Sequence, residues 1–89
     1  MSSNSYDIIV TKKAFKQLKK IDHKEQDRIT EFLKSLQHIN PKSQGKELKG
    51  SLSGVWRYRV GNYRILTHIK DEKLTVLVVK IGHRKDIYK

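Results

Sequence analysis

Residues 55–66 read Val-Trp-Arg-Tyr-Arg-Val-Gly-Asn-Tyr-Arg-Ile-Leu, and this stretch has the pattern of a β-hairpin. Two runs rich in β-branched and aromatic residues flank Gly61-Asn62, a typical two-residue hairpin loop. A loop of two residues fixes the register of the strands and places Arg59 directly opposite Arg64. Because side chains alternate along a strand, Arg57 lies on the same face as these two arginines.

The other face of the hairpin carries the side chains that a core needs, namely Trp56, Tyr58, Val60, Tyr63 and Ile65. The face that carries Arg57, Arg59 and Arg64 is therefore expected to point to solvent. A like-charge pair directly across two strands costs roughly 0.2–1 kcal/mol unless an anion or a carboxylate compensates it. Two interpretations follow: a neighbouring carboxylate, for which Glu47 and Asp86 are candidates, or a phosphate-binding patch on a rigid hairpin.

The sequence on either side of the hairpin predicts two more strands. Residues 74–81 are apolar at nearly every position, which is typical of a central strand covered on both faces. Residues 6–11 form a short β-rich run. Residues 41–54 are rich in turn formers and are predicted to be a loop, with Leu48 and Leu52 anchoring it to the core.

Two amphipathic helices are predicted between the first strand and this loop. Thr11 is suited to cap the first helix, whose apolar residues share one face. Asp22 begins a capping-box pattern for the second helix, and Asn40-Pro41 ends it. The whole chain, residues 1–89, is thus expected to be one α+β domain of order β-α-α-β-β-β. A helical hairpin would pack on one face of a mainly antiparallel four-stranded sheet.

Composition narrows the classes of function. Twenty lysines and arginines oppose nine acidic residues, for a net charge of +11, which favours a polyanionic partner. The charge is uneven: residues 1–41 hold eight basic and five acidic groups (+3), and residues 42–89 hold twelve and four (+8). Four of the five arginines lie in this second part, and arginine suits bidentate phosphate recognition.

Several kinds of site and location are disfavoured. The chain has no cysteine, which excludes disulfides and thiolate metal sites and favours a reducing cytosol. Its four histidines show no close ligand spacing, and no carboxylate cluster suggests Mg²⁺, so we expect neither a metal nor another cofactor. The N-terminal residues lack the features of a signal peptide, and no apolar run is long enough for a membrane span. We therefore expect a cytoplasmic protein without a membrane partner.

The C-terminal tail, Gly82-His-Arg-Lys-Asp-Ile-Tyr88, directly follows the predicted buried strand. His83, Arg84 and Tyr88 should therefore emerge at one end of the sheet, within reach of the hairpin arginines. Arginines with a histidine and a tyrosine suit the attack of a ribose 2′-hydroxyl on its own neighbouring phosphate, because the substrate supplies the nucleophile. DNA, which lacks the 2′-hydroxyl, would not be cut in this way.

Two motifs give the chain a specific resemblance. Residues 48–66, from Leu48-Lys-Gly-Ser-Leu to Tyr-Arg-Ile-Leu66, and the ending Val79-Lys-Ile-Gly-His-Arg-Lys-Asp-Ile-Tyr88 resemble the RelE family of the RelE/ParE toxin superfamily. The resemblance covers essentially the whole chain. It implies the toxin of a type II toxin–antitoxin system, an endoribonuclease (mRNA interferase) that cleaves mRNA in the ribosomal A site. The implied partners are the ribosome, mRNA and a cognate acidic antitoxin, with operator DNA bound only through the antitoxin complex.

The resemblance also implies roles for individual residues. Tyr88 would help to activate the 2′-hydroxyl, Arg64 would stabilise the transition state, and Arg84 would protonate the leaving 5′-oxygen. Because an arginine general acid is awkward on pKa grounds, His83 is the chemically more natural donor and is included among the candidate catalytic residues. The candidate RNA-binding residues are Arg57, Arg59, Lys46, Lys49 and Lys85.

The sequence departs from the family pattern in two places. Arg57 and Arg59 stand where the well-studied member has lysines, so this pair should act only electrostatically. Arg84 and Tyr88 are also closer together than their counterparts. Two alternative functions remain open: a ParE-like toxin that inhibits DNA gyrase, and a non-catalytic module that binds RNA or an antitoxin.

Overall fold

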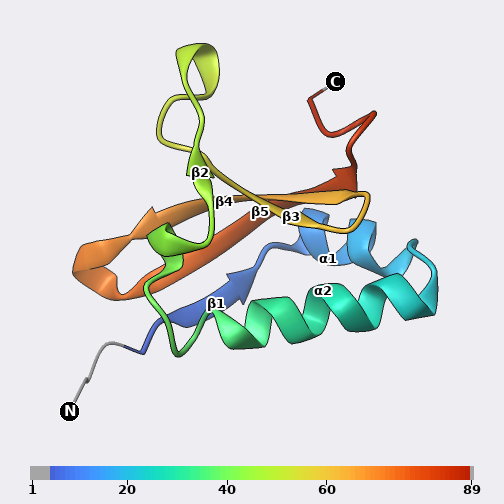
Figure 1. Cartoon of the computed structure of the whole chain (residues 1–89), viewed down its shortest axis with the longest axis horizontal. Helices are drawn as coiled ribbons and strands as arrows, with labels where there is room; N and C mark the ends of the chain where they lie inside the picture. Colours follow the sequence, from blue (N-terminus) through green and yellow to red (C-terminus); the bar gives the residue numbers. More distant parts are fainter. Residues whose placement is uncertain (1–4, 89) are drawn as a thin grey trace.

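The computed structural model describes residues 5–88, which form two helices and a five-stranded sheet (Figure 1). The helices are α1 (Lys12–Lys19) and α2 (His23–Ser35). The strands are β1 (Asp7–Val10), β2 (Lys46–Glu47), β3 (Trp56–Val60), β4 (Tyr63–Lys70) and β5 (Thr75–His83). Three short 3₁₀ turns lie at Pro41–Ser43, Gly50–Leu52 and Asp71–Lys73. Within residues 5–88, neither helix combines the length and apolar character needed to cross a membrane.

The strands are arranged in the order β1-β5-β4-β3-β2, and only the β1–β5 pair is parallel. The predicted α+β class, with a helical hairpin on a mainly antiparallel sheet, is confirmed. The strand count was too low by one, because β2 lies in the segment that was predicted to be a loop. Two residues are too few to show the alternation that marks a strand in sequence. Strand β2 is defined instead by its pairing with β3, where Lys46 lies opposite Arg57.

Both helices begin at the residues that the sequence indicates. The Thr11 hydroxyl accepts the N–H of Ala14 at 3.1 Å, and the Asp22 carboxylate accepts the N–H of Lys24 at 3.2 Å. Each bond satisfies a backbone donor that the first helical turn leaves without a partner.

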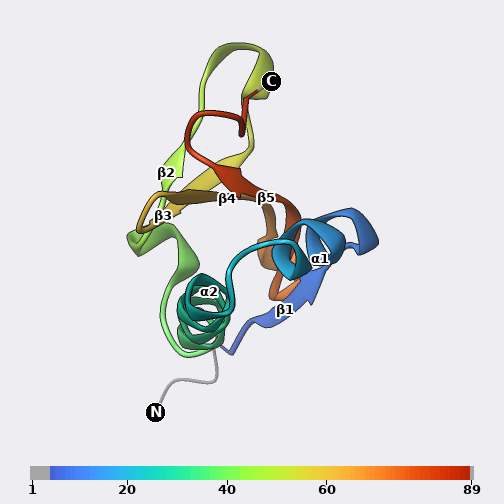
Figure 2. The ribbon, with the colours of Figure 1, turned by 90° about the vertical axis from the view of Figure 1, so that its right-hand side faces the viewer.

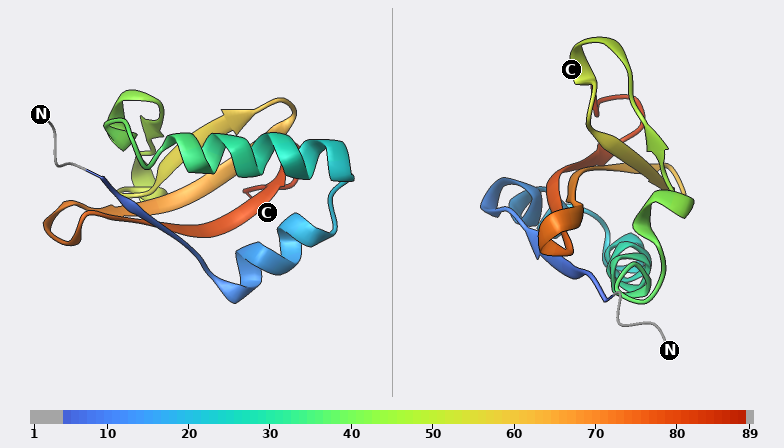
Figure 3. Two further views of the ribbon diagram at one scale, coloured as in Figure 1. Left: turned by 90° about the horizontal axis from the view of Figure 1, so that it is seen from below. Right: turned by 90° about the vertical axis from the view of Figure 1, so that its left-hand side faces the viewer.

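The helices cover one face of the sheet and form a single core with it (Figure 3). Its buried members are Ala14, Leu18, Ile29, Leu33, Leu36, Tyr58, Ile65, Val78 and Ile81. The segment that follows β2 and the C-terminal tail rise from the opposite side of the sheet (Figures 1 and 2). The fold thus separates a helix-covered face from a face flanked by these two irregular segments.

Two expectations about burial were wrong. Leu52 is 37% exposed and does not anchor the loop to the core. Strand β5 is central, but only its helix side is fully covered, since Leu77 and Val79 on β5 are only half-buried. The β4–β5 pairing also has a register shift between Leu66 and Thr67: Leu66 lies opposite Lys80, whereas Thr67 lies opposite Val78. The extra residue on β5 is typical of a β-bulge.

Candidate functional site

The β3–β4 hairpin has the predicted register. Arg59 lies opposite Arg64, and Arg57 lies opposite Leu66. Gly61 has a φ of +58°, as the first central residue of a type II′ hairpin turn requires. The three arginines therefore lie on the face of the sheet away from the helices, on a short and well-paired hairpin.

The positive charge of this face is not neutralised within the described chain. Among residues 5–88, no carboxylate lies within ion-pair distance of Arg57, Arg59, Arg64 or Arg84. Glu47 lies opposite Trp56 and so points to the other face, where it acts on Lys42. Of the two interpretations of the Arg59–Arg64 pair, the structure therefore favours an anion-binding face, since in the described part of the chain neither Glu47 nor Asp86 forms an ion pair with these arginines.

Arg64 lies at the centre of the cluster. Its Nη1 donates to the backbone oxygens of Tyr63 at 3.1 Å and Gly61 at 3.3 Å, which holds the guanidinium against the hairpin turn. The residue as a whole is half-buried. Burial is the largest cause that lowers the pKa of Arg64, followed by the charges of Arg59, Arg57 and Arg84. Arginine nevertheless stays protonated in proteins. The site thus holds a fixed cation whose charge is destabilised by its neighbours and would be stabilised by a bound anion.

The C-terminal tail completes this cluster. The backbone N–H of Arg84 donates to the backbone oxygen of Asn62 at 2.9 Å, so the tail is joined to the hairpin turn. Ile87 is 1% exposed, and its Cδ1 lies 3.3 Å from the position that a Cβ on Gly82 would occupy. Tyr88 is 50% exposed and acts electrostatically on Arg64, opposing the lowering of its pKa. Arg84 and Tyr88 are thus both close enough to Arg64 to affect its pKa.

His83 has a different position. It lies directly opposite Tyr63, which packs against the core on the helix side of the sheet. The two rings meet edge to face, with centroids 5.6 Å apart. The neighbouring pair is Arg64 and Gly82, so the His83 side chain and the arginines start from opposite faces of the sheet. The structure brings together Arg57, Arg59, Arg64, Arg84 and Tyr88, and it places the His83 ring beside Tyr63.

The three candidate lysines extend the basic surface. Lys46 is paired with Arg57 and therefore shares its face. Lys49 lies in the segment after β2, and Lys85 lies in the tail, the two segments that flank this face (Figure 2). All three side chains are exposed. We use the name arginine face for Arg57, Arg59, Arg64, Arg84 and Tyr88.

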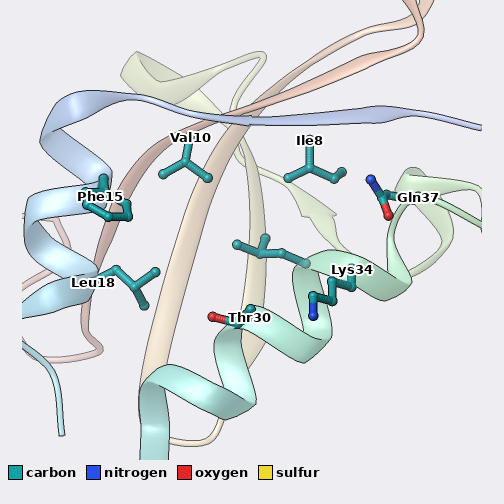
Figure 4. Close-up of a pocket in the computed structure, with 8 residues that line it drawn as sticks. Ile8, Val10, Phe15, Leu18, Thr30, Lys34 and Gln37 are labelled. Carbon is teal, nitrogen blue, oxygen red and sulfur yellow. The ribbon is translucent and has the colours of Figure 1, made fainter. Parts of the chain in front are cut away.

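The chain also has a concave apolar feature, but it lies away from the arginine face. A cavity of about 310 Å³ opens between β1, α1 and α2, and Figure 4 shows Val10, Phe15 and Leu18 directed into it. Thr30, Lys34 and Gln37 supply its polar lining. This lining does not resemble a phosphate-binding site, so the cavity is not part of the candidate site.

Sequence reasoning missed the residues that hold the tail in place. Gly82 and Ile87 form the contact that closes the tail over the sheet, and the Asn62 oxygen joins the tail to the hairpin. One signal was present in the sequence: a glycine within a strand often marks a close approach of another segment. The Asn62 bond left no signal, because it uses a backbone oxygen that every residue has.

Comparison with known proteins gives the family of this chain. A profile described as "ParE toxin of type II toxin-antitoxin system, parDE" matches residues 8–88. Toxin RelG of Mycobacterium tuberculosis is 33% identical over 84 residues, which cover 94% of this chain and 97% of that protein. The chain belongs to the RelE/ParE toxin superfamily. It is therefore a type II toxin, as the sequence motifs indicated.

Solved structures of RelE/ParE toxins agree with this assignment. The toxin–antitoxin complex RelBE2 of M. tuberculosis contains a chain with a TM-score of 0.84 and 32% identity, covering 90% of this chain and 99% of that one. A RelB–RelE complex from Methanococcus jannaschii matches with a TM-score of 0.71 and 30% identity, covering 90% and 94%. The isolated Escherichia coli RelE toxin, at 18% identity and a TM-score of 0.71, covering 89% of this chain and 84% of its own, shows the same fold.

Proposed function

We propose that this toxin is a ribosome-dependent mRNA endonuclease that cleaves mRNA in the ribosomal A site and so inhibits translation in the cytoplasm. The observation that carries the proposal is the arginine face: three arginines and a tyrosine gathered around a fixed Arg64, with no carboxylate in ion-pair distance of the arginines among residues 5–88. A face of this kind is suited to a phosphate that gains negative charge during a reaction.

The reaction that fits these groups is an internal transfer at one phosphate. The ribose 2′-oxygen loses its proton and attacks the adjacent phosphorus, and the bond to the 5′-oxygen breaks. The products are a 2′,3′-cyclic phosphate and a 5′-hydroxyl end, with the proton finally on the 5′-oxygen. Arg64 would neutralise the charge that grows on the phosphate, Arg84 would stabilise the leaving oxygen, and Tyr88 would assist proton removal.

Binding and catalysis are assigned to different parts of the face. Arg57 and Arg59 lie on β3 and make no ion pair with described residues, so their charge is available to RNA phosphates. The exposed Lys46, Lys49 and Lys85 would add further contacts. Such contacts position a nucleic acid without reading its sequence. The ribosome would then supply the alignment of the substrate.

The proposed partner that inhibits this toxin is a cognate acidic antitoxin. RelB–RelE complexes are known for structural relatives of this chain at 30% and 32% identity. The net charge of +11 favours an acidic partner, and a disordered acidic segment could cover the whole arginine face. Operator DNA would be bound only through that complex.

A second function is favoured by one observation, the match to a profile named for ParE. A ParE-like toxin would inhibit DNA gyrase and would not need the tyrosine beside the arginines. The two functions separate in one experiment: translating ribosomes are incubated with the toxin and the mRNA ends are mapped by primer extension, while a gyrase supercoiling assay is run in parallel. New mRNA ends inside codons, with normal supercoiling, support the endonuclease.

A further inference from the structure

The last described residues form a single turn in which three backbone N–H groups bond to one residue. The backbone oxygen of His83 accepts the N–H of Asp86 at 2.8 Å and that of Ile87 at 3.0 Å. The imidazole Nδ1 of His83 accepts the N–H of Lys85 at 3.2 Å. The backbone N–H groups of three consecutive residues, Lys85, Asp86 and Ile87, therefore donate to His83.

This pattern is that of a helix N-cap. An N-cap residue has a backbone oxygen that accepts the first helical bonds and a side chain that accepts the N–H two or three residues later. His83 meets both conditions for residues 84–87, and its ring takes the place of the usual Asn, Asp, Ser or Thr side chain. The remaining backbone donor of the turn, the N–H of Arg84, donates to the backbone oxygen of Asn62 at 2.9 Å.

The His83 ring also contacts an aromatic residue of the neighbouring strand β4. It packs edge-on against Tyr63, with 5.6 Å between centroids and an interplanar angle of 77°. Tyr63 is in turn the residue whose backbone oxygen accepts Arg64 Nη1 at 3.1 Å. The side chain of His83 thus connects the strand that carries Arg64 to the turn that carries Arg84 and Tyr88.

We infer that His83 is a positioning residue, which caps the terminal turn and so holds Arg84 and Tyr88 beside Arg64. The inference rests on the proposed function, because it assigns His83 a role in the same reaction. It replaces the role of proton donor that the sequence suggested. A group that accepts a backbone N–H through Nδ1, with its ring on the helix side of the sheet, does not need to touch the substrate to affect the rate.

Two substitutions separate a positioning role from proton donation. Asparagine can accept the N–H two residues along through its side-chain oxygen, as in an Asx turn, but it cannot act as an acid at neutral pH. Leucine preserves contact with Tyr63 but accepts nothing. His38→Leu, a change of an exposed histidine beyond α2, is the control for the loss of a histidine.

The first measurement is backbone amide exchange by NMR on the free toxin, which requires no activity. We expect His83→Leu to speed exchange at Lys85, Asp86 and Ile87 by about fivefold or more, as loss of an N-cap does, and His83→Asn to stay within about threefold of the wild type. Unchanged exchange in His83→Leu would overturn the inference. Because this measurement does not involve RNA, it stays decisive even if the wild type fails to cleave mRNA.

The second measurement is the single-turnover rate on saturating ribosomes. Misplacement of Arg84 and Tyr88 should slow His83→Leu by about 10- to 100-fold, with ribosome association within about threefold of the wild type. His83→Asn should recover most of the rate. If His83→Asn has wild-type amide exchange but is as slow as His83→Leu, the imidazole itself takes part in the reaction and the inference is wrong.

Discussion

Arg59 lies directly opposite Arg64 in the β3–β4 ladder, and no described carboxylate forms an ion pair with either residue. Two like charges in this position destabilise the folded chain, so the pair is a cost to folding that a bound phosphate would offset. The relationship connects the stability of the hairpin to the proposed function, because the same charges that weaken the hairpin would strengthen the proposed binding to RNA.

Removal of one of these charges should stabilise the protein. We expect Arg59→Thr, which retains a residue suited to a strand, to raise the free energy of unfolding by roughly 0.2–1 kcal/mol at low salt. The gain should shrink as salt screens the pair. Urea denaturation at low and high ionic strength tests this, with Lys70→Thr as a control for a general loss of charge, because Lys70 is an exposed strand residue of β4 that lies opposite Thr75. A loss of stability at low salt would show that Arg59 has a favourable partner in the fold.

Arg57 and Arg64 should separate binding from chemistry. Arg57→Ala should weaken ribosome association. It should also reduce the slope of log K against log salt concentration by about 1, the amount that corresponds to one phosphate contact. Arg64→Ala should leave association nearly intact and lower the single-turnover rate by about 10² or more. Arg64→Lys should not restore the rate, because lysine has a single nitrogen and, once it bonds the backbone oxygens, has no planar fork left for a phosphate. Equal losses of binding in both alanine variants would show that this division is wrong.

The sequence was sufficient for the hairpin, both helices and the central position of the last strand, since each has a repeated pattern over many residues. It was insufficient for β2, which has two residues, and for the exposure of Leu52, which depends on the path of an irregular loop. The shared face of Arg57, Arg59 and Arg64 followed from register alone, whereas the proximity of Arg84 and Tyr88 followed from their position just after the last strand. The position of the His83 ring did not, because it depends on which face the strand presents at its last residue and on the turn that follows.

Tyr58 should make stability depend on pH in the alkaline range. Its hydroxyl donates to the Pro41 oxygen at 2.7 Å, and burial raises its pKa to about 12 from 10.0. A raised folded-state pKa stabilises the protonated form, so this stability is complete below about pH 10 and is lost as the pH rises toward about 12. The free energy of unfolding of the wild type should therefore fall more steeply over this window than that of Tyr58→Phe. Parallel curves for the two proteins would contradict the assignment.

Near neutral pH, Tyr58→Phe should lower the free energy of unfolding by roughly 1–3 kcal/mol, because the buried backbone oxygen of Pro41 loses its donor.

The antitoxin should cover the arginine face. Association of the cognate antitoxin should slow as salt is added, because charge complementarity acts mainly on the association rate. Arg59→Thr should weaken this salt dependence, whereas Lys13→Thr on α1, outside the arginine face, should change it less. The measurement is stopped-flow association at several salt concentrations. An antitoxin that docks only on the helix side and leaves the toxin active in the complex would contradict the occlusion of this face.

The central claim is that the toxin cuts mRNA through the substrate's own 2′-hydroxyl. The most direct test uses ribosomes programmed with two messages that differ only in the A-site codon, which carries ribose in one and 2′-deoxyribose in the other. The account predicts that wild-type toxin cuts the ribose message, leaving a 2′,3′-cyclic phosphate and a 5′-hydroxyl, and that both the deoxy message and Arg64→Ala on the ribose message give little or no product. Equal cleavage of both messages, or no cleavage of either while gyrase supercoiling is inhibited, would contradict it.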